Sequence, residues 1–202
     1  MTNPFDARAP DWDDHPHRRR LAAEIFAALE RRVPLGPELA ALDYGCGTGL
    51  LALALAPRVR RVTAVDSSRG MLDVLARKIQ AAGIGNVVPL QADFATDPHP
   101  AGPYDLIVSA MTLHHVADVA VLLRTFMGML GSGGMLALAD LDLEDGSFHA
   151  HAEGVRHFGF DRTELANLLA SIGFVEVRCE TAARIERPFR TYSAFLATAR
   201  QG

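Results

Sequence analysis

A glycine-rich turn near the start of the chain restricts its fold more than any other feature. The turn follows an apolar, strand-like segment and leads into a helix-like one, in the sequence Leu42-Asp43-Tyr44-Gly45-Cys46-Gly47-Thr48-Gly49-Leu50. Glycines at alternate positions have no Cβ atoms, so backbone N–H groups can come close to a ligand. The sequence therefore predicts a ligand-binding turn between a strand and a helix.

Two features of the turn indicate the kind of ligand. Nicotinamide dinucleotide turns have the pattern Gly-x-Gly-x-x-Gly, which here would require a glycine in place of Leu50. Asp43 lies two residues before the first glycine. Its carboxylate would repel a pyrophosphate, which prefers free N–H groups at a helix N-terminus. The same carboxylate suits a ligand that carries positive charge.

The rest of the chain alternates between strand and helix patterns, which is typical of a mostly parallel sheet with right-handed crossovers. No helix fits between the last two β-rich segments, so they should pair as an antiparallel hairpin. The expected strands are 39–44, 61–66, 87–92, 104–110, 135–141, 175–183 and 192–200. The expected helices include 17–32 and 50–56. Three more follow N-caps: one runs from Ser67 or Ser68 to Ala82, one from Asp118 to Leu130, and one from Asp161 to Ile172.

Across residues 38–200 the chain resembles the class I S-adenosylmethionine-dependent methyltransferases, in the small-molecule branch that methylates ubiquinone and menaquinone precursors. The resemblance implies a Rossmann-like three-layer α/β sandwich. Its seven-stranded, mostly parallel sheet would have the order 3-2-1-4-5-7-6 and a C-terminal antiparallel hairpin. It also implies S-adenosylmethionine as the cofactor and S-adenosylhomocysteine as the product. That cofactor carries an ammonium and a sulfonium, which suits Asp43.

Residues at the carboxyl ends of the strands should form the cofactor site, because ligands of open α/β sheets bind there. Asp66 lies 19 residues after Gly47, where a carboxylate that accepts from both ribose hydroxyls is expected. The resemblance implies that Asp93 and the N–H of Phe94 contact the adenine and that the carbonyl of Ala110 holds the methionine ammonium. The predicted cofactor-binding residues are Asp43, Gly45, Cys46, Gly47, Gly49, Asp66, Ser67, Asp93, Phe94, Ala110 and Met111.

The catalytic requirement is modest, because the cofactor brings the electrophile and the protein must align the acceptor and exclude water. A general base is needed only where the acceptor loses a proton. His114 and His115 are the candidates, in a Leu-His-His segment that resembles one common in the small-molecule branch. The alternative is that both histidines are structural. Three acceptor classes do not fit the sequence. The chain lacks the tetrapeptide of nucleobase methylases, the paired glutamates of arginine methylases and the cysteine trio that an arsenite acceptor would need. The remaining reactions are oxygen, carbon or sulfur methylation of a small molecule.

The connection after the fifth strand is rich in potential metal ligands. Asp140 ends that strand, and His149, His151 and His157 follow. Histidines on an irregular loop do not define a coordination geometry. We therefore expect no metal, and a polar wall around the acceptor instead.

Residues 1–37 are expected to form an arm and a helix that precede the core of 38–200 in one domain, 1–202. The arm contains Phe5 and Trp12, and it either covers the cofactor as a lid or is simply anchored to the core. Arg18, Arg19 and Arg20 are expected to form a solvated helix face rather than a nucleic-acid surface, because Asp13 and Asp14 lie close in sequence.

Composition narrows the class of protein further. The formal net charge of -4 argues against nucleic acid as a partner, and no apolar run is long enough to span a bilayer. Cys46 and Cys179 lie far apart, which favours a reducing cytoplasm. The expectation is a cytoplasmic monomer or homodimer. A regulatory module that binds the cofactor without transfer and a nicotinamide-dependent oxidoreductase remain as alternatives.

Overall fold

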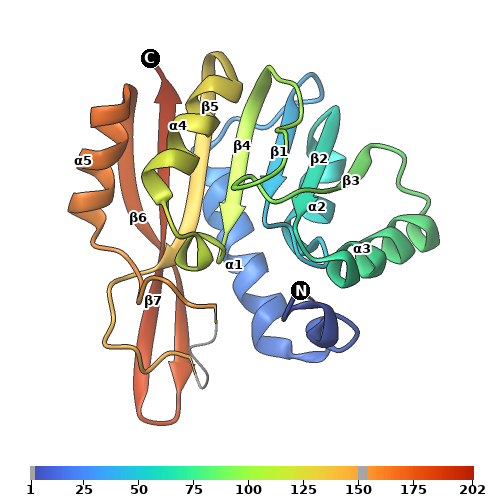
Figure 1. Cartoon of the computed structure of the whole chain (residues 1–202), viewed down its shortest axis with the longest axis horizontal. Coiled ribbons are helices and arrows are strands. Elements are labelled where there is room, and N and C mark those ends of the chain that lie inside the picture. The colour runs from blue at the N-terminus through green and yellow to red at the C-terminus, as the bar shows by residue number, and fades with distance from the viewer. Residues whose placement is uncertain (1–2, 150–153) are drawn as a thin grey trace.

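The computed structural model describes residues 3–149 and 154–202. A seven-stranded sheet in the order β3-β2-β1-β4-β5-β7-β6 forms its centre (Figure 1). β7 pairs antiparallel with β5 and β6, and the other pairs are parallel. The predicted fold class and strand order are confirmed. The strands are β1 (Ala40–Tyr44), β2 (Arg61–Asp66), β3 (Val87–Gln91), β4 (Tyr104–Ala110), β5 (Leu130–Leu141), β6 (Phe174–Arg187) and β7 (Arg190–Gln201).

Helices cover both faces of this sheet, so that it is the middle of three layers. One face carries α1 (Pro16–Arg32), α2 (Leu50–Leu55) and α3 (Arg69–Ala82), and the other carries α4 (Val119–Met129) and α5 (Arg162–Ile172). Leu106 and Ile107 are neighbours in β4, yet they belong to opposite cores, because side chains alternate along a strand. None of the helices in the described ranges has the length and apolarity that a membrane crossing requires.

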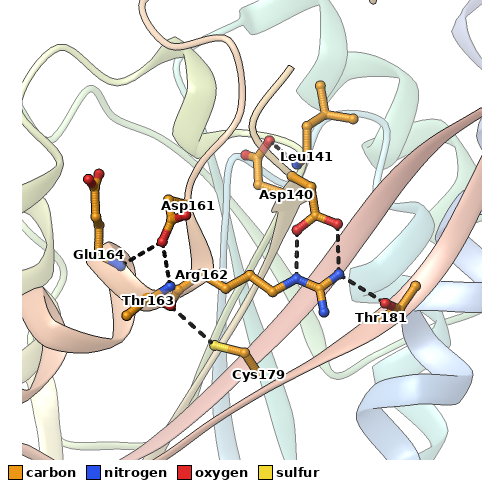
Figure 2. A network of polar contacts seen from close by, with 9 residues as sticks. Asp140, Leu141, Asp161, Arg162, Thr163, Glu164, Cys179 and Thr181 are labelled. Atoms are coloured by element: carbon orange, nitrogen blue, oxygen red, sulfur yellow. Dashed lines mark hydrogen bonds and ion pairs between the residues drawn. The ribbon is translucent and has the colours of Figure 1, made fainter.

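Three of the helices begin at the caps that the sequence predicts. Ser68 accepts from the N–H of Met71 at 3.2 Å, and Asp118 accepts from the N–H of Val121 at 2.9 Å. Asp161 accepts from the N–H groups of Thr163 and Glu164 in α5, as Figure 2 shows. These bonds satisfy donors that have no partner within the first helical turn. The caps set where α3, α4 and α5 start relative to the strands before them.

Two boundaries differ from the sequence prediction. β5 begins at Leu130 rather than Met135 and includes glycines that were expected to end α4. A Cβ at Gly134 would lie 2.8 Å from the carbonyl oxygen of Gly131, so this part of the strand needs glycine for its close backbone contacts. The terminal hairpin is also longer than predicted, because β6 continues to Arg187 and β7 starts at Arg190.

The extra length of the hairpin adds a wall near the cavity described below. The end of β5 at Leu141 pairs with Ala194, so the first residues of β7 continue past β5. In Figure 1 the hairpin extends beyond the carboxyl ends of the parallel strands, on the same side as the N-terminal segment. That segment forms two 3₁₀-helices, η1 (Asp6–Arg8) and η2 (Trp12–Asp14), before α1.

Candidate functional site

A cavity of about 690 Å³ opens at the carboxyl ends of β1, β2 and β4. The predicted cofactor-binding residues other than Gly49 line it, and so do His114 and His115. Gly49 precedes α2 with a φ of 84°, and a Cβ there would lie 2.3 Å from Cδ1 of Leu75. The structure thus gives Gly49 a role in packing α2 against α3, and its contact with a cofactor stays a prediction.

The glycine-rich turn lies against β2 and the end of β4. The N–H groups of Gly45 and Cys46 both donate to the carbonyl of Val65, at 2.8 and 2.9 Å. Gly45 has a φ of 70°, and a Cβ there would lie 2.3 Å from the side chain of Thr112. Both the backbone conformation and the close approach of the second loop therefore require glycine at position 45.

Two carboxylates lie beside the turn. Asp43 is buried, and its Oδ2 has no hydrogen-bond partner among residues 3–149 and 154–202. Burial, reinforced by the charge of Asp66, raises the pKa of Asp43 to about 7. Asp66 accepts from the N–H groups of Gly47 at 2.7 Å and Ser68 at 2.8 Å, and burial raises its pKa as well. Carboxylate oxygens have more lone pairs than these bonds use, so both residues can still accept from a ligand.

Aromatic rings and a carboxylate line the cavity beside β3. The ring of Phe94 lies 4.9 Å from that of Tyr44 and 4.9 Å from that of His99, measured between centroids. Asp93 is exposed and accepts from the N–H of Ala95 at 2.9 Å. Ser67 accepts at Oγ from the side chain of Asn3 at 3.0 Å, which brings the N-terminal segment to this part of the cavity. A flat apolar surface beside an exposed carboxylate is suited to a ring that carries an amine.

The end of β4 presents its backbone to the cavity. Ala110 and Met111 line it, and Met111 has a φ of 56°, which is uncommon outside glycine. The N–H of Met111 donates to the carbonyl of Ala139 in β5 at 2.8 Å. The hydroxyl of Thr112 donates to the carbonyls of Gly45 and Ala110, both at 3.2 Å. This loop is therefore bonded to the glycine-rich turn and to β5.

The same loop carries a buried histidine–aspartate pair. His114, which is 3% exposed, lies in η4 (Leu113–His115), and Asp140 lies fully buried near the end of β5. Nδ1 of His114 is 2.7 Å from Oδ1 of Asp140, and the backbone N–H of His114 donates to Oδ2 at 3.2 Å. Because the carboxylate accepts, Nδ1 carries the proton and Nε2 has the lone pair. No residue in the described part of the chain bonds to that Nε2, and His114 lines the cavity.

The position of Asp140 is fixed by the strand around it (Figure 2). Its Oδ1 also accepts from the N–H of Leu141 at 2.7 Å. Asp142, two residues on, forms a two-pronged pair with Arg162 of α5, with nitrogen–oxygen distances of 2.6 and 2.7 Å. Arg162 also donates to the hydroxyl of Thr181 in β6 at 2.9 Å. This planar fork joins the connection directly after β5 to α5 and β6, close to the strand end that carries Asp140.

The other histidines near the cavity have weaker partners. His115 donates from Nδ1 to the carbonyl of Gly154 at 2.9 Å, and burial lowers its pKa. His149 lies 5.0 Å from His114 between ring centroids, and burial lowers its pKa to about 4. His157 donates to a backbone carbonyl at 2.9 Å. His151, also named in the sequence analysis, lies outside the described residues. Among the described histidines, His114 alone pairs with a carboxylate.

The N-terminal segment lies over the glycine-rich turn. Asp13 accepts from the hydroxyl of Thr48 at 2.6 Å and pairs with Nζ of Lys78 at 2.6 Å. Lys78 also donates to the carbonyl of Thr48 at 2.7 Å. These bonds join the segment to α3 and to the turn. The aromatic residues of the segment, Phe5 and Trp12, line the cavity.

Sequence reasoning missed two roles. Asp140 was considered as a metal ligand, whereas the structure pairs it with His114. The signal was available, because the loops after adjacent parallel strands lie side by side, and β4 and β5 are adjacent. The sequence predicts a solvated position for Arg18, whereas in the structure Arg18 lines the cavity with its Cζ 3.7 Å from the centre of the Trp12 ring.

Comparisons with known proteins show similarity to methyltransferases. The family described as "Methyltransferase domain" matches residues 41–134. An uncharacterized methyltransferase of Mycobacterium tuberculosis is 37% identical over 126 residues, which cover 61% of this chain and 62% of the relative. The ubiquinone biosynthesis O-methyltransferase of Marinobacter nauticus is 33% identical over 152 residues, which cover 71% of this chain and 63% of the relative. The chain thus matches less than two thirds of the length of these two relatives.

A solved structure is similar over almost the whole chain. The S-adenosylmethionine-dependent methyltransferase of Aquifex aeolicus superposes with a TM-score of 0.72 at 20% identity, covering 98% of each chain. At this identity the likeness concerns the fold.

Proposed function

We propose that this chain is a class I S-adenosylmethionine-dependent methyltransferase, which binds S-adenosylmethionine in the cavity and transfers the methyl group to a hydroxyl oxygen of a small molecule. The carboxylates of Asp43 and Asp66 support a cofactor with two cationic groups. The relatives named for this cofactor and for O-methyl transfer support the same reaction.

The proposed cofactor contacts follow from the donors and acceptors of the site. Asp66 would accept from the ribose hydroxyls, and Asp93 with the N–H of Phe94 would contact the adenine. The carbonyl of Ala110 would accept from the methionine ammonium, with Asp43 supplying the opposing charge. The remaining contacts would come from the backbone of Gly45, Cys46, Gly47, Ser67 and Met111.

The bound cofactor supplies the electrophilic methyl group, and the protein removes the proton of the acceptor. Nε2 of His114 accepts that proton, and Asp140 stabilises the imidazolium that results and holds the ring in one tautomer. A phenolic hydroxyl has a pKa of about 10 and stays protonated at neutral pH, so its oxygen needs a base. A thiol has a pKa of about 8.5, so it depends less on a general base. The buried pair of His114 and Asp140 is the single observation that favours oxygen as the methylated atom.

The test compares two adjacent histidines. His114→Gln is expected to lower kcat by about 10²- to 10⁴-fold and to leave the affinity for S-adenosylhomocysteine unchanged. His115→Gln is expected to lower kcat by less than about tenfold, because His115 bonds only to a backbone carbonyl. Release of S-adenosylhomocysteine with a panel of phenols measures kcat, and calorimetry measures affinity. Equal losses in the two variants would contradict the assignment of His114 as the base.

We also propose that the N-terminal segment acts as a lid and that the protein works in the cytoplasm. The N-terminal segment, as part of residues 1–37, would cover the cofactor bound to the core of 38–200, because Asp13 joins it to Thr48 beside the site. Cys46 and Cys179 are both free thiols, which supports a reducing cytoplasmic environment. A small molecule as acceptor, without nucleic acid, fits an enclosed cavity and the net charge of -4.

A further inference from the structure

The end of the cavity away from the glycine-rich turn combines apolar walls with positive charge. It lies between α1 and the hairpin of β6 and β7. Leu21, Ile25 and Ile185 supply apolar surface, and Arg18 and Arg187 supply charge. The cofactor end carries carboxylates instead, so the two ends of one cavity have opposite charge.

Arg18 is held in a defined position. Its Cζ lies 3.7 Å from the centre of the Trp12 ring, and its Nη1 donates to the carbonyl of Trp12 at 3.1 Å. A guanidinium has five N–H donors, and stacking on an aromatic face leaves those at its edge available. Among the described residues, no carboxylate lies within 4.0 Å of this guanidinium.

Arg187 differs from the arginine that faces it across the hairpin. Arg187 and Arg190 are partners in the strand pairing. Arg190 forms an ion pair with Asp145 at 2.5 Å and does not line this cavity. Arg187 lines the cavity, with its Cζ 5.3 Å from the centre of the Phe148 ring, and no carboxylate of the described ranges lies within 4.0 Å of it. One arginine completes a contact within the protein, and the other is available to a ligand.

The two guanidiniums act on the same part of the cavity. His17 also lines it, and its pKa is lowered by burial and by the charges of Arg187 and Arg18. Like charges that share a partly enclosed space repel one another, and a bound anion relieves that repulsion. The His17 ring can donate a further hydrogen bond.

We propose that the methyl acceptor is an amphipathic acid, with a hydroxyl group for His114, an apolar body along Leu21 and Ile185, and a carboxylate that Arg18 and Arg187 bind. This inference rests on the proposed function, because it names the acceptor of that reaction. The planar guanidinium edge matches the two oxygens of a carboxylate. Arg18 and Arg187 are thus specificity-determining residues that lie at the opposite end of the acceptor from the reacting oxygen.

The test uses two probes of the same shape, para-hydroxyphenylpropanoate and its uncharged amide. Calorimetry in the presence of saturating S-adenosylhomocysteine measures both affinities without turnover. The wild type is expected to bind the acid at least about tenfold more tightly than the amide. Arg187→Gln is expected to reduce this preference to less than about threefold, whereas Arg187→Lys keeps part of it. Arg190→Gln is the matched control and is expected to keep the full preference.

Several results would overturn the inference: equal binding of acid and amide by the wild type, binding of neither probe, an undiminished preference in Arg187→Gln, or an equal loss in Arg190→Gln. Arg18→Gln is measured together with its thermal unfolding, because its stacking on Trp12 also supports the N-terminal segment. Failure of the proposed function gives a different result. A protein that prefers the acid but releases no S-adenosylhomocysteine during incubation with S-adenosylmethionine keeps the anion site and loses the transfer reaction.

Discussion

The cofactor end and the acceptor end of the cavity are built in different ways. At the cofactor end, one continuous segment from Asp43 to Thr48 lines the cavity, and the ends of β2 and β3 add carboxylates. At the acceptor end, side chains from α1, from the connection after β5 and from the terminal hairpin meet across the cavity. The first end is a local structure, and the second depends on the assembly of distant segments.

The difference has a consequence for specificity. Backbone groups in a glycine-rich turn are tied to the fold and cannot be exchanged by substituting side chains. Side chains such as Arg187 and Phe148 can change without altering the sheet, because they lie on loops and strand ends at its edge. The same cofactor site can therefore be combined with acceptor sites of different specificity.

The largest effect is expected from Gly45→Ala at the cofactor end. Alanine would adopt an unfavourable positive φ and would contact Thr112, so the free energy of unfolding should fall by about 2–4 kcal/mol. Urea denaturation measures this. Gly36→Ala is the control, since a Cβ there meets no atom within 4 Å and φ is ordinary. Retention of full stability and of S-adenosylhomocysteine affinity in Gly45→Ala would remove the turn from the proposed site.

The second effect concerns the charge of Asp43. Its pKa of about 7 means that a cationic ligand, which binds the ionised form, must displace a proton at lower pH. The affinity for S-adenosylhomocysteine is therefore expected to fall by up to about tenfold per pH unit below pH 7 and to level off above it. In Asp43→Asn the affinity at pH 8 should be about 10- to 100-fold weaker, with this pH dependence lost. Calorimetry from pH 5.5 to 8.5, values that bracket the pKa of about 7, provides the measurement.

The unligated protein should respond to the same substitution in the opposite direction. The pKa of Asp43 lies above its ordinary value of 3.8, so the folded state keeps a proton that the unfolded state loses. Stability from this group falls as pH rises from about 4 to about 7. Asp43→Asn should therefore raise the melting temperature of the unligated protein at pH 8. A lower melting temperature would show that the carboxylate stabilises the fold rather than serving the ligand.

The same contrast explains what the sequence could predict. The cofactor end could be predicted in outline because its residues follow a local pattern, in which Gly45, Asp66 and Asp93 each terminate or follow a strand. The acceptor end could not, because the role of a side chain there depends on its partner. The adjacency of β4 and β5, which the predicted strand order already contains, brings Asp140 opposite His114, but only the structure shows that the two side chains bond. Arg18 is one of three consecutive arginines, and only the tertiary structure shows that it faces inward.

The boundary errors have a related cause. Gly131, Gly133 and Gly134 are a typical helix-ending sequence, yet β5 runs through them because β4 pairs with Leu130 at Tyr104. A contact between distant segments overrides the local preference. The hairpin extension to Arg187 was missed for the same reason, since its partner strand supplies the bonds.

A third and smaller effect is expected from Asp13→Asn, which tests whether the N-terminal segment acts as a lid over the cavity. The substitution removes the charge that pairs with Lys78 and weakens the bond from Thr48. S-adenosylhomocysteine should then dissociate about three- to tenfold faster, because the N-terminal segment opens more often. Stopped-flow displacement measures the rate, and Asp14→Asn, an exposed neighbour on the same segment, is the control. An unchanged rate in Asp13→Asn would mean that the segment is anchored without acting as a lid.

The smallest effect is expected from Cys46→Ala, which separates backbone from side chain within the turn. Burial raises the pKa of the Cys46 thiol well above its ordinary value, so the thiol stays protonated and is a poor nucleophile. Its backbone N–H donates to Val65, a bond that alanine keeps. Turnover and affinity for S-adenosylhomocysteine should therefore change by less than about threefold. A tenfold loss of turnover with unchanged affinity would mean that the Cys46 side chain takes part in the reaction. The cofactor end would then not consist of backbone groups and carboxylates alone.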